Sequence, residues 1–196
     1  MRLVPKMILG VDEAGRGPLA GPVAIGVIAV PETFLIAREF PMLADSKLLS
    51  PLARARLFKL MRARMRVGDI QFCVRFTSAR RIDKWGLTRA VRNTVSRGVR
   101  ALAPDPSDVR IFLDGLLTAP EEYDQQTIVG GDEAVPAIAL ASIAAKVTRD
   151  RFMVRMAKLF PHYGFEIHKG YGTKAHRLAL KKYGPSAIHR MSFLRS

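Results

Sequence analysis

Short runs of apolar residues, each ended by charged or turn-forming residues, mark the expected strands of this chain. Residues 7–11 form a first run that stops abruptly in the string Asp-Glu-Ala-Gly-Arg-Gly-Pro, and residues 22–30 form a second run rich in Val and Ile. Runs of this length bounded by Gly and Pro predict β-strands. The two runs are expected to pair as a hairpin, and further strands are expected at residues 69–76, 109–113 and, weakly, 127–129.

Apolar residues at helical spacing occupy most of the chain between these runs. Residues 51–66 combine apolar positions with six basic side chains, and Ser50-Pro51 suits the N-cap and first turn of a helix. Apolar residues recur three and four positions apart in three further segments, which predicts helices at residues 86–102, 136–159 and 174–183. Strands followed by alternating strands and helices predict an α/β fold, in which a sheet carries helices on its faces and a helical appendage follows at the C-terminus.

The net charge of the chain is unusual. The 196 residues include 32 Lys and Arg against 17 Asp and Glu, which gives a net charge of +15. Such an excess favours a polyanionic partner, because each phosphate that Lys or Arg neutralises releases condensed counterions. An anionic membrane is the main alternative, but no long basic amphipathic segment is paired with an aromatic apolar face, so we expect no membrane partner.

Cysteine usage and the N-terminal residues bear on the cellular compartment. Cys73 is the only cysteine, so neither an intramolecular disulfide nor a thiolate zinc site can form. The apolar stretch near the N-terminus is interrupted by Pro5 and Lys6 and is too short for a secretory signal or a membrane span. We therefore expect a cytoplasmic protein.

Acidic residues follow three of the expected strands. Asp12 and Glu13 end the first run, Asp114 ends the run at 109–113, and Asp132 follows the weak fifth strand through Gly130-Gly131. Ligands bind at strand ends in open α/β sheets, and carboxylates suit Mg²⁺ or Mn²⁺, which could activate water for attack on a phosphodiester. Any one of these acids taken alone is more often a turn former or a helix cap than a metal ligand. Asp12 and Glu13 are adjacent, so both reach one site only if the chain turns there, which Ala14-Gly15 permits.

Five sequence motifs bring these acids together with other residues. They are VDEAGRGPLAGPV at 11–23, DSKLLS at 45–50, FLDG at 112–115, GGDEAVPAIALASIAAKVTRD at 130–150 and HKGYGT at 168–173. In this order, and over nearly the whole chain, they closely resemble the ribonuclease HII family. The resemblance implies a ribonuclease H-like fold, a mixed five-stranded sheet with flanking helices, made by residues 1–160, and a C-terminal helical region packed on it at 161–196.

The same resemblance implies an activity. A protein of this family hydrolyses the RNA strand of RNA–DNA hybrids and cuts 5′ of single ribonucleotides embedded in duplex DNA. It does so by two-metal-ion hydrolysis with Mg²⁺ or Mn²⁺ and leaves 3′-OH and 5′-phosphate ends. The expected partners are thus an RNA–DNA hybrid and ribonucleotide-containing duplex DNA, and we expect a monomer. The charge alone would also fit a non-catalytic nucleic-acid-binding protein, and the acids alone would fit another carboxylate-metal nuclease on the same fold.

The resemblance also assigns roles to individual residues. It implies a catalytic, metal-binding site made by Asp12, Glu13, Asp114 and Asp132. The backbone of Gly15-Arg16-Gly17 would lie against the ribonucleotide and recognise its 2′-OH, and Tyr171 would pack on the ribose. Candidate phosphate contacts are Lys47, Ser142, Lys146 and Arg149. Asp150 is read as a structural partner of Arg149, Arg151 or another base, and the glycines at 86 and 130 depart from the family's usual Asn and Lys, which could weaken the grip on substrate.

Overall fold

A mixed five-stranded sheet forms the centre of the protein, in the strand order β3-β2-β1-β4-β5. The structure is a computed structural model that describes residues 7–43 and 49–194. Strands β1 (Met7–Ala14), β2 (Val23–Pro31) and β3 (Gln71–Thr77) are antiparallel neighbours, whereas β4 (Val109–Asp114) and β5 (Asp124–Ile128) extend the sheet in parallel from β1. The expected hairpin and the expected mixed sheet are both confirmed.

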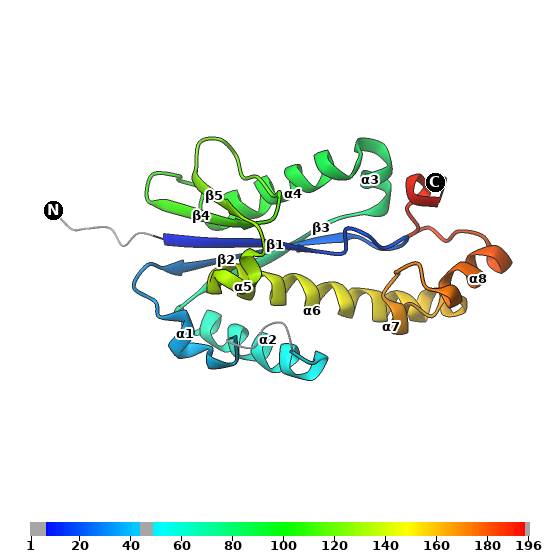
Figure 1. Cartoon of the computed structure of the whole chain (residues 1–196), viewed down its shortest axis with the longest axis horizontal. Helices are drawn as coiled ribbons and strands as arrows, with labels where there is room; N and C mark the ends of the chain where they lie inside the picture. The colour runs from blue at the N-terminus through cyan, green and yellow to red at the C-terminus, as the bar shows by residue number, and fades with distance from the viewer. Residues whose placement is uncertain (1–6, 44–48, 195–196) are drawn as a thin grey trace.

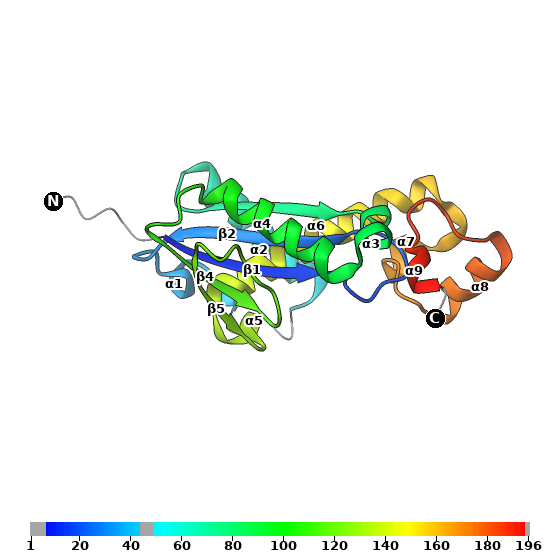
Figure 2. The same cartoon turned by 90° about the horizontal axis from the view of Figure 1, so that it is seen from above.

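Helices cover both faces of this sheet (Figure 1). Helix α6 (Pro136–Leu159) lies along one face and α4 (Leu87–Leu102) along the other. Figure 2, a view from above, shows α4 lying over the strands. Glycine allows α6 to approach closely: a Cβ on Gly10 would lie 2.2 Å from the backbone of Ala137, and one on Gly26 would lie 2.1 Å from the carbonyl oxygen of Ala141. The long helix that carries several candidate residues is therefore held directly against β1 and β2.

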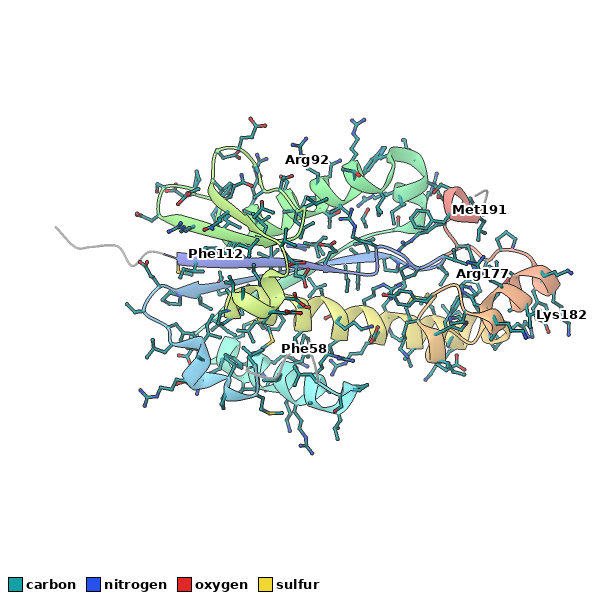
Figure 3. All side chains as sticks on the ribbon, viewed as in Figure 1. Phe58, Arg92, Phe112, Arg177, Lys182 and Met191 are labelled. Atoms are coloured by element: carbon teal, nitrogen blue, oxygen red, sulfur yellow. The ribbon has the colours of Figure 1, made fainter. Side chains whose placement is uncertain are left out.

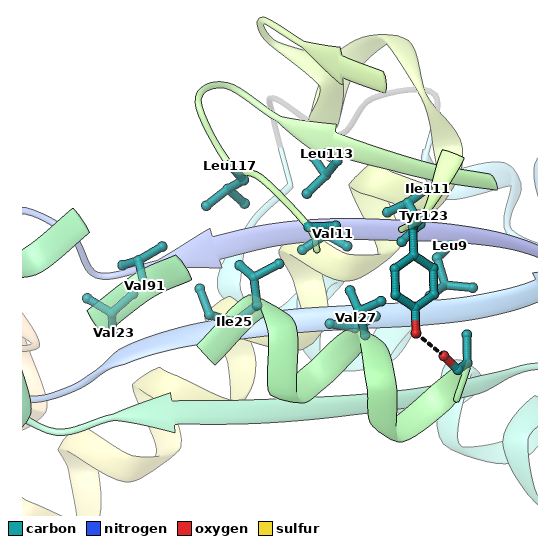
Figure 4. Close-up of a cluster of buried hydrophobic side chains, with 14 of the residues drawn as sticks. Leu9, Val11, Val23, Ile25, Val27, Val91, Ile111, Leu113, Leu117 and Tyr123 are labelled. Atoms are coloured by element: carbon teal, nitrogen blue, oxygen red, sulfur yellow. Dashed lines mark hydrogen bonds between the residues drawn. The ribbon is translucent and has the colours of Figure 1, made fainter. Parts of the chain in front are cut away.

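The other face of β1 supplies the main core. Leu9 and Val11 point away from α6 and pack with Ile25 and Val27 of β2 under α4, and all four are fully buried (Figure 4). Tyr123 closes this cluster, and its hydroxyl donates a hydrogen bond to the carbonyl of Ala103. Burying an aliphatic side chain of this size contributes about 2 kcal/mol, so the cluster fixes β1 firmly.

Local sequence signals predict the bounds of the helices better than those of the strands. Helix α2 (Pro51–Arg66) begins where Ser50 accepts a hydrogen bond from the N–H of Ala53, as the Ser-Pro pair predicts. Helices α6 and α8 (Lys174–Tyr183) also match their predictions. Strand β1 continues three residues past the expected end, because β2 pairs with it as far as Ala14↔Ala24. The fifth strand lies earlier than predicted, at Asp124–Ile128, and α3 (Ala79–Trp85) was not predicted.

Short elements complete the fold on either side of the long helix. Helices α1 (Ile36–Glu39) and α5 (Gly131–Ala134) lie near its start. The 3₁₀ helix η2 (Pro161–Tyr163), α7 (Phe165–His168), α8 and α9 (Met191–Leu194) lie at the opposite end of the molecule (Figure 2). There Met153 and Ala157 of α6 pack against Tyr163 and Phe165. None of the helices in the described residues is both long enough and apolar enough to cross a membrane.

Candidate active site

Two acids meet at the edge of the sheet because β1 and β4 are parallel. The last printed pair of their register is Val11↔Leu113, so the residues that follow, Asp12 and Asp114, emerge side by side. Asp12 faces α6 and is only 5% exposed. Burial, with a smaller contribution from the charges of Asp114 and Glu13, raises the pKa of Asp12 to about 7, although hydrogen bonds from the Ser142 side chain and the Glu13 backbone lower it. Asp12 is therefore a carboxyl group whose negative charge is poorly compensated.

Glu13 belongs to the same site, and the chain turns after it, within the Ala14-Gly15 pair that permits a turn. Strand β1 stays extended through Ala14, so the turn comes at Gly15. The pairing of β1 with β4 ends at Val11, so β4 does not pair with Glu13. The Glu13 side chain lines a cavity at this end of β1. Burial raises the pKa of Glu13, while Arg16, whose Nη1 lies 3.2 Å from Oε1, lowers it. Its Oε2 atom is buried and has no hydrogen-bond partner among the described residues.

Asp132 is placed by a contact from Asp114. The Asp114 Oδ1 atom accepts a hydrogen bond from the N–H of Gly131 at 2.7 Å, which fixes the start of α5. Gly130 precedes it with a φ of 66°, a left-handed conformation that suits glycine. Asp132 lies in the first turn of α5 and lines the same cavity as Glu13. The four predicted acids thus gather around the ends of β1 and β4.

A cavity of about 340 Å³ lies beside two of these acids, Glu13 and Asp132, and against α6. Its walls come from the segments of these two acids, from α6, from the start of α2 and from the loop before α8. The lining residues that the motifs single out are Glu13, Gly15, Asp132, Ser142, Lys146 and Tyr171. Asp12 and Asp114 do not line the cavity but are tied to residues that do, Asp12 to Ser142 and Asp114 to the segment of Asp132.

These carboxylates have the chemistry of a divalent-metal site. As they stand, no three acidic, histidine or cysteine side chains in the described part of the chain form a group that could hold a metal ion. Mg²⁺, however, is usually held by one or two carboxylates, with water and substrate phosphate completing its coordination. The unpartnered Glu13 Oε2 and the desolvated Asp12 carboxylate are hard oxygen donors of this kind. The residues present fit such an ion.

The glycine turn and Tyr171 meet above the buried side chain of Arg149. Gly15 has a φ of 91°, and a Cβ there would lie 1.9 Å from the Nε of Arg149. Gly17 is exposed, and a Cβ there would meet nothing within 4 Å. The Tyr171 ring is 44% exposed and lies 5.8 Å from the Arg149 guanidinium. Gly15 of the turn and Tyr171 thus both line the cavity.

Arg149 itself was wrongly predicted to contact phosphate. It is 1% exposed, so no phosphate can reach it. Its guanidinium donates instead to three backbone carbonyls, those of Pro22, Ala20 and Lys169. The residue is structural, and it ties the segment after the glycine turn to the segment before Tyr171.

The other predicted phosphate contacts have different surroundings. Ser142 borders the cavity beside Asp12. Lys146 also borders it, and its Nζ lies 2.9 Å from Asp150, which makes Lys146 the structural partner of Asp150 in place of the neighbouring arginines. Lys47 lies outside the described residues.

A second hollow lies on the other side of the glycine turn. It has a volume of about 830 Å³ and runs between the start of α4 and the segment after β4. Arg16, Arg89 and Arg92 line it together with Trp85, and none of its described lining residues is acidic. Figure 3 shows Arg92 on the α4 side of the sheet, and Arg177 and Lys182 at the C-terminal end. Gly86, one of the two glycines that depart from the family's usual residues, lines this hollow and has a φ of 76°.

The sequence did not single out three buried basic residues near the site. Arg190 is fully buried, His176 is fully buried and His189 is 3% exposed. In the sequence Arg190 looks like any basic residue, and the two histidines have no recognisable spacing. Their partners are backbone carbonyls, Ser186 and each other, so no pattern along the chain identifies them.

Comparisons with known proteins agree with this arrangement. A family model described as Ribonuclease HII matches residues 9–196. A ribonuclease HII of Coxiella burnetii is 42% identical over 191 residues, covering 95% of this chain and 88% of that protein. Among solved structures, ribonuclease H2 of Pyrococcus horikoshii matches with a TM-score of 0.73 and 26% identity, over 95% of this chain and 93% of that one. Ribonuclease HII of Archaeoglobus fulgidus, solved in a complex with PCNA, has a TM-score of 0.76 at 22% identity, over 94% of each chain.

Proposed function

The chain belongs to the ribonuclease HII family, and from this we propose that the carboxylates at the ends of β1 and β4 are its catalytic centre. The family membership carries the activity: the protein is an endoribonuclease that acts on the RNA strand of RNA–DNA hybrids. Cutting 5′ of a single ribonucleotide in duplex DNA, with 3′-OH and 5′-phosphate products, is the activity typical of that family.

One observation carries the assignment of the catalytic centre to these residues. Asp12 is buried and its pKa is raised to about 7, although buried acids in structural roles normally have a cationic partner. Glu13 contributes a buried oxygen without a partner, and Asp114 adds a third charge. A purely structural or purely binding protein has no use for uncompensated negative charge beside a phosphate site. Perturbed acids grouped at a cavity are typical of a catalytic centre.

We propose Mg²⁺ or Mn²⁺ as the cofactor, held by Asp12, Glu13, Asp114 and Asp132. When bound, such ions polarise the scissile phosphate and lower the pKa of a water molecule that attacks it. The chain's own contribution is to hold the acids. Ser142 orients the Asp12 carboxylate from α6, and the Gly131 N–H orients that of Asp114. Because the Asp12 carboxylate and the Glu13 Oε2 atom are buried, water does not readily hydrogen-bond to them.

The ribonucleotide is recognised, in this proposal, by the glycine turn and Tyr171. Backbone groups of Gly15-Arg16-Gly17 can approach a sugar closely because Gly15 and Gly17 have no Cβ. Tyr171, partly exposed across the cavity, packs on the ribose. Lys146 at the cavity wall, and Lys47, supply positive charge to the phosphates of the cut strand. The 2′-OH is the feature that separates RNA from DNA at every sequence, so contacts to the sugar give cutting that is nearly independent of base identity.

The arginine-lined hollow beyond the turn suits the second strand of the duplex. Gly15 borders the acidic cavity while Arg16 borders the arginine hollow, so the turn separates the two spaces. A duplex seated across the turn would place the cut strand at the acids and the DNA strand beside Arg89 and Arg92. The excess of 15 positive charges supports such phosphate contacts.

Mapping the cut on an end-labelled duplex tests the proposal. The substrate is a DNA duplex with one ribonucleotide, and the products are resolved beside a ladder and treated with a 5′-phosphate-dependent exonuclease. A single cut 5′ of the ribonucleotide, with a 5′-phosphate on the downstream piece, is expected. Cuts in all-DNA duplex would instead favour another nuclease on this fold, and stable binding without any cutting would favour a non-catalytic protein.

The remaining properties of the protein stay proposals. We propose that residues 1–160 form the catalytic domain and residues 161–196 a helical region packed on it. We also propose that the protein is a monomer. Because the substrate is nucleic acid and the single cysteine cannot form an intramolecular disulfide, we propose that it works in the cytoplasm.

A further inference from the structure

Arg190 holds the glycine turn from the opposite end of the chain. Its Nη2 donates to the carbonyl of Gly15 and its Nη1 to that of Arg16, both at 2.6 Å, and its Nε donates to the carbonyl of Gly21 at 2.9 Å. The side chain is fully buried, so water cannot replace these bonds. A planar guanidinium has donors at fixed angles, so three such bonds define where the turn lies.

His189, the preceding residue, connects to Tyr171 through a chain of hydrogen bonds. The N–H of Ser186 donates to His189 Nδ1 at 2.8 Å, so the proton of the neutral ring is on Nε2. That atom lies 2.9 Å from His176 Nε2, which must therefore accept. The proton of His176 is then on Nδ1, 2.9 Å from the carbonyl oxygen of Tyr171. The donors and acceptors match along the whole chain only when both rings are neutral.

Backbone contacts bring the three segments into one unit. The N–H of Leu19 donates to the carbonyl of Gly170 at 2.9 Å, and the N–H of Arg190 donates to the carbonyl of Leu19 at 2.8 Å. The segment from the glycine turn to β2 thus lies between the loop of Tyr171 and the segment of His189 and Arg190. Asp83 of α3 anchors the latter segment, because its carboxylate accepts from the N–H groups of Met191 and Ser192.

We propose that Arg190 and His189 are positioning residues that fix the glycine turn and Tyr171 relative to each other, so that both contact one ribonucleotide. The inference rests on the proposed function, in which these two segments read the ribose. Neither side chain lines the cavity. Arg190 donates to the carbonyl of Gly15, and His189 acts on the carbonyl of Tyr171 through His176. A misplacement of about 1 Å in such contacts can lower a rate by about 100-fold without unfolding the protein.

Variants of Arg190 test the proposal with Arg97 as the matched control. Arg97 is an exposed arginine of α4 that borders neither hollow, so Arg97→Lys makes the same substitution at a surface position. Arg190→Lys keeps the charge but cannot make the three bonds. We expect kcat on a duplex with one ribonucleotide to fall about 10- to 100-fold in Arg190→Lys, with the duplex Kd within about twofold. Arg97→Lys should leave kcat unchanged.

A double variant separates positioning from stability alone. If Arg190 acts through ribose alignment, adding Arg190→Lys to Tyr171→Ala should lower kcat much less than it does in the wild type. Equal losses in both backgrounds, or a fall in Tm with unchanged kcat, would overturn the proposal. If the Arg190 variants do not fold, His189→Gln and His189→Phe give the answer. Gln keeps a donor toward His176 and Phe does not, so Gln should retain more kcat, and equal values overturn the proposal.

The wild-type protein distinguishes this inference from the proposed function. If it does not cut the ribonucleotide duplex at all, the proposed function fails, and the inference fails with it. If it cuts and Arg190→Lys behaves like Arg97→Lys, the proposed function stands and the positioning role is wrong.

Discussion

The carboxylate of Asp114 accepts a hydrogen bond from the N–H of Gly131, with 2.7 Å between Oδ1 and N. The contact joins the end of β4 to the start of α5, so the position of Asp132 depends on Asp114. Because asparagine keeps the accepting oxygen, Asp114→Asn should preserve this geometry while removing one negative charge. The substitution therefore separates the charge of Asp114 from its structural role.

We expect Asp114→Asn to abolish turnover while duplex binding stays the same or becomes tighter. Loss of the carboxylate weakens the binding of the divalent ion, and it also reduces the repulsion between the site and the substrate phosphates. Asp124→Asn is the matched control, since Asp124 is an exposed acid on β5 away from the cavity. Single-turnover rates and Kd values at millimolar Mg²⁺ decide the matter. Near-normal turnover in Asp114→Asn would remove Asp114 from the catalytic centre.

Tyr171→Ala should affect the two substrate types unequally. At a single embedded ribonucleotide the ring packs on the one ribose present, so most activity should be lost. On a continuous RNA–DNA hybrid neighbouring riboses supply further contacts, and relatively more activity should remain. Comparing kcat/KM on both substrates below saturation measures this. Equal losses would make Tyr171 a general packing residue, in keeping with its ring contact to Arg149.

The arginine hollow should contribute to the salt dependence of binding. Log affinity for a duplex falls with log salt by roughly 0.9 per neutralised phosphate. Arg89→Ala combined with Arg92→Ala should therefore reduce the slope by about 1 to 2 and weaken binding to all sequences alike. Filter-binding titrations at several salt concentrations give the slope. A slope equal to that of wild type would place the second strand elsewhere.

Acid should destabilise the protein through the histidine pair. Burial, followed by the charge of His176, lowers the pKa of His189 from 6.5 to about 4, with a smaller contribution from His168. The unfolded chain then binds a proton below about pH 6.5 that the folded chain does not take up until about pH 4. The free energy of unfolding that the neutral His189 contributes is fully present above about pH 6.5. It falls by up to about 3 kcal/mol as the pH drops from there to about 4.

His189→Gln removes this titration, because glutamine is neutral at both ends of the window. Urea unfolding at about pH 7 and about pH 5 should thus show a smaller pH effect in the variant than in the wild type. His176 and His168 remain in the variant, so a residual dependence is expected. An unchanged pH effect would show that His189 is not the group responsible.

The sequence predicts the helices of this fold better than its sheet edges. Ser50-Pro51 and the apolar spacing in α6 are local signals, and both helices match their predictions. The DQQTI segment of β5 is a polar edge strand with almost no apolar pattern, so it was misplaced. Strand β1 outran its apolar residues because pairing with β2 continues past Asp12 and Glu13.

For the site, sequence motifs identify the residues that face the cavity but not those that support them. The acids, the glycine turn and Tyr171 lie in motifs, and Glu13, Asp132, Gly15 and Tyr171 line the cavity. Arg149 and Arg190 are indistinguishable from surface cations in the sequence, because most of their partners are carbonyls more than a hundred positions away along the chain. Only the tertiary structure reveals that their charge is buried.

If these acids form the catalytic centre, the protein cuts a strand only where a 2′-OH is present and a divalent ion is bound. Two labelled duplexes of identical sequence test this, one with a single ribonucleotide and one all-DNA, each incubated with Mg²⁺ and with EDTA. We expect one cut, 5′ of the ribonucleotide, in the first duplex with Mg²⁺ alone and none in the other three reactions. Equal cutting of the all-DNA duplex, or cutting that persists in EDTA, would show that the acids do not act in this way.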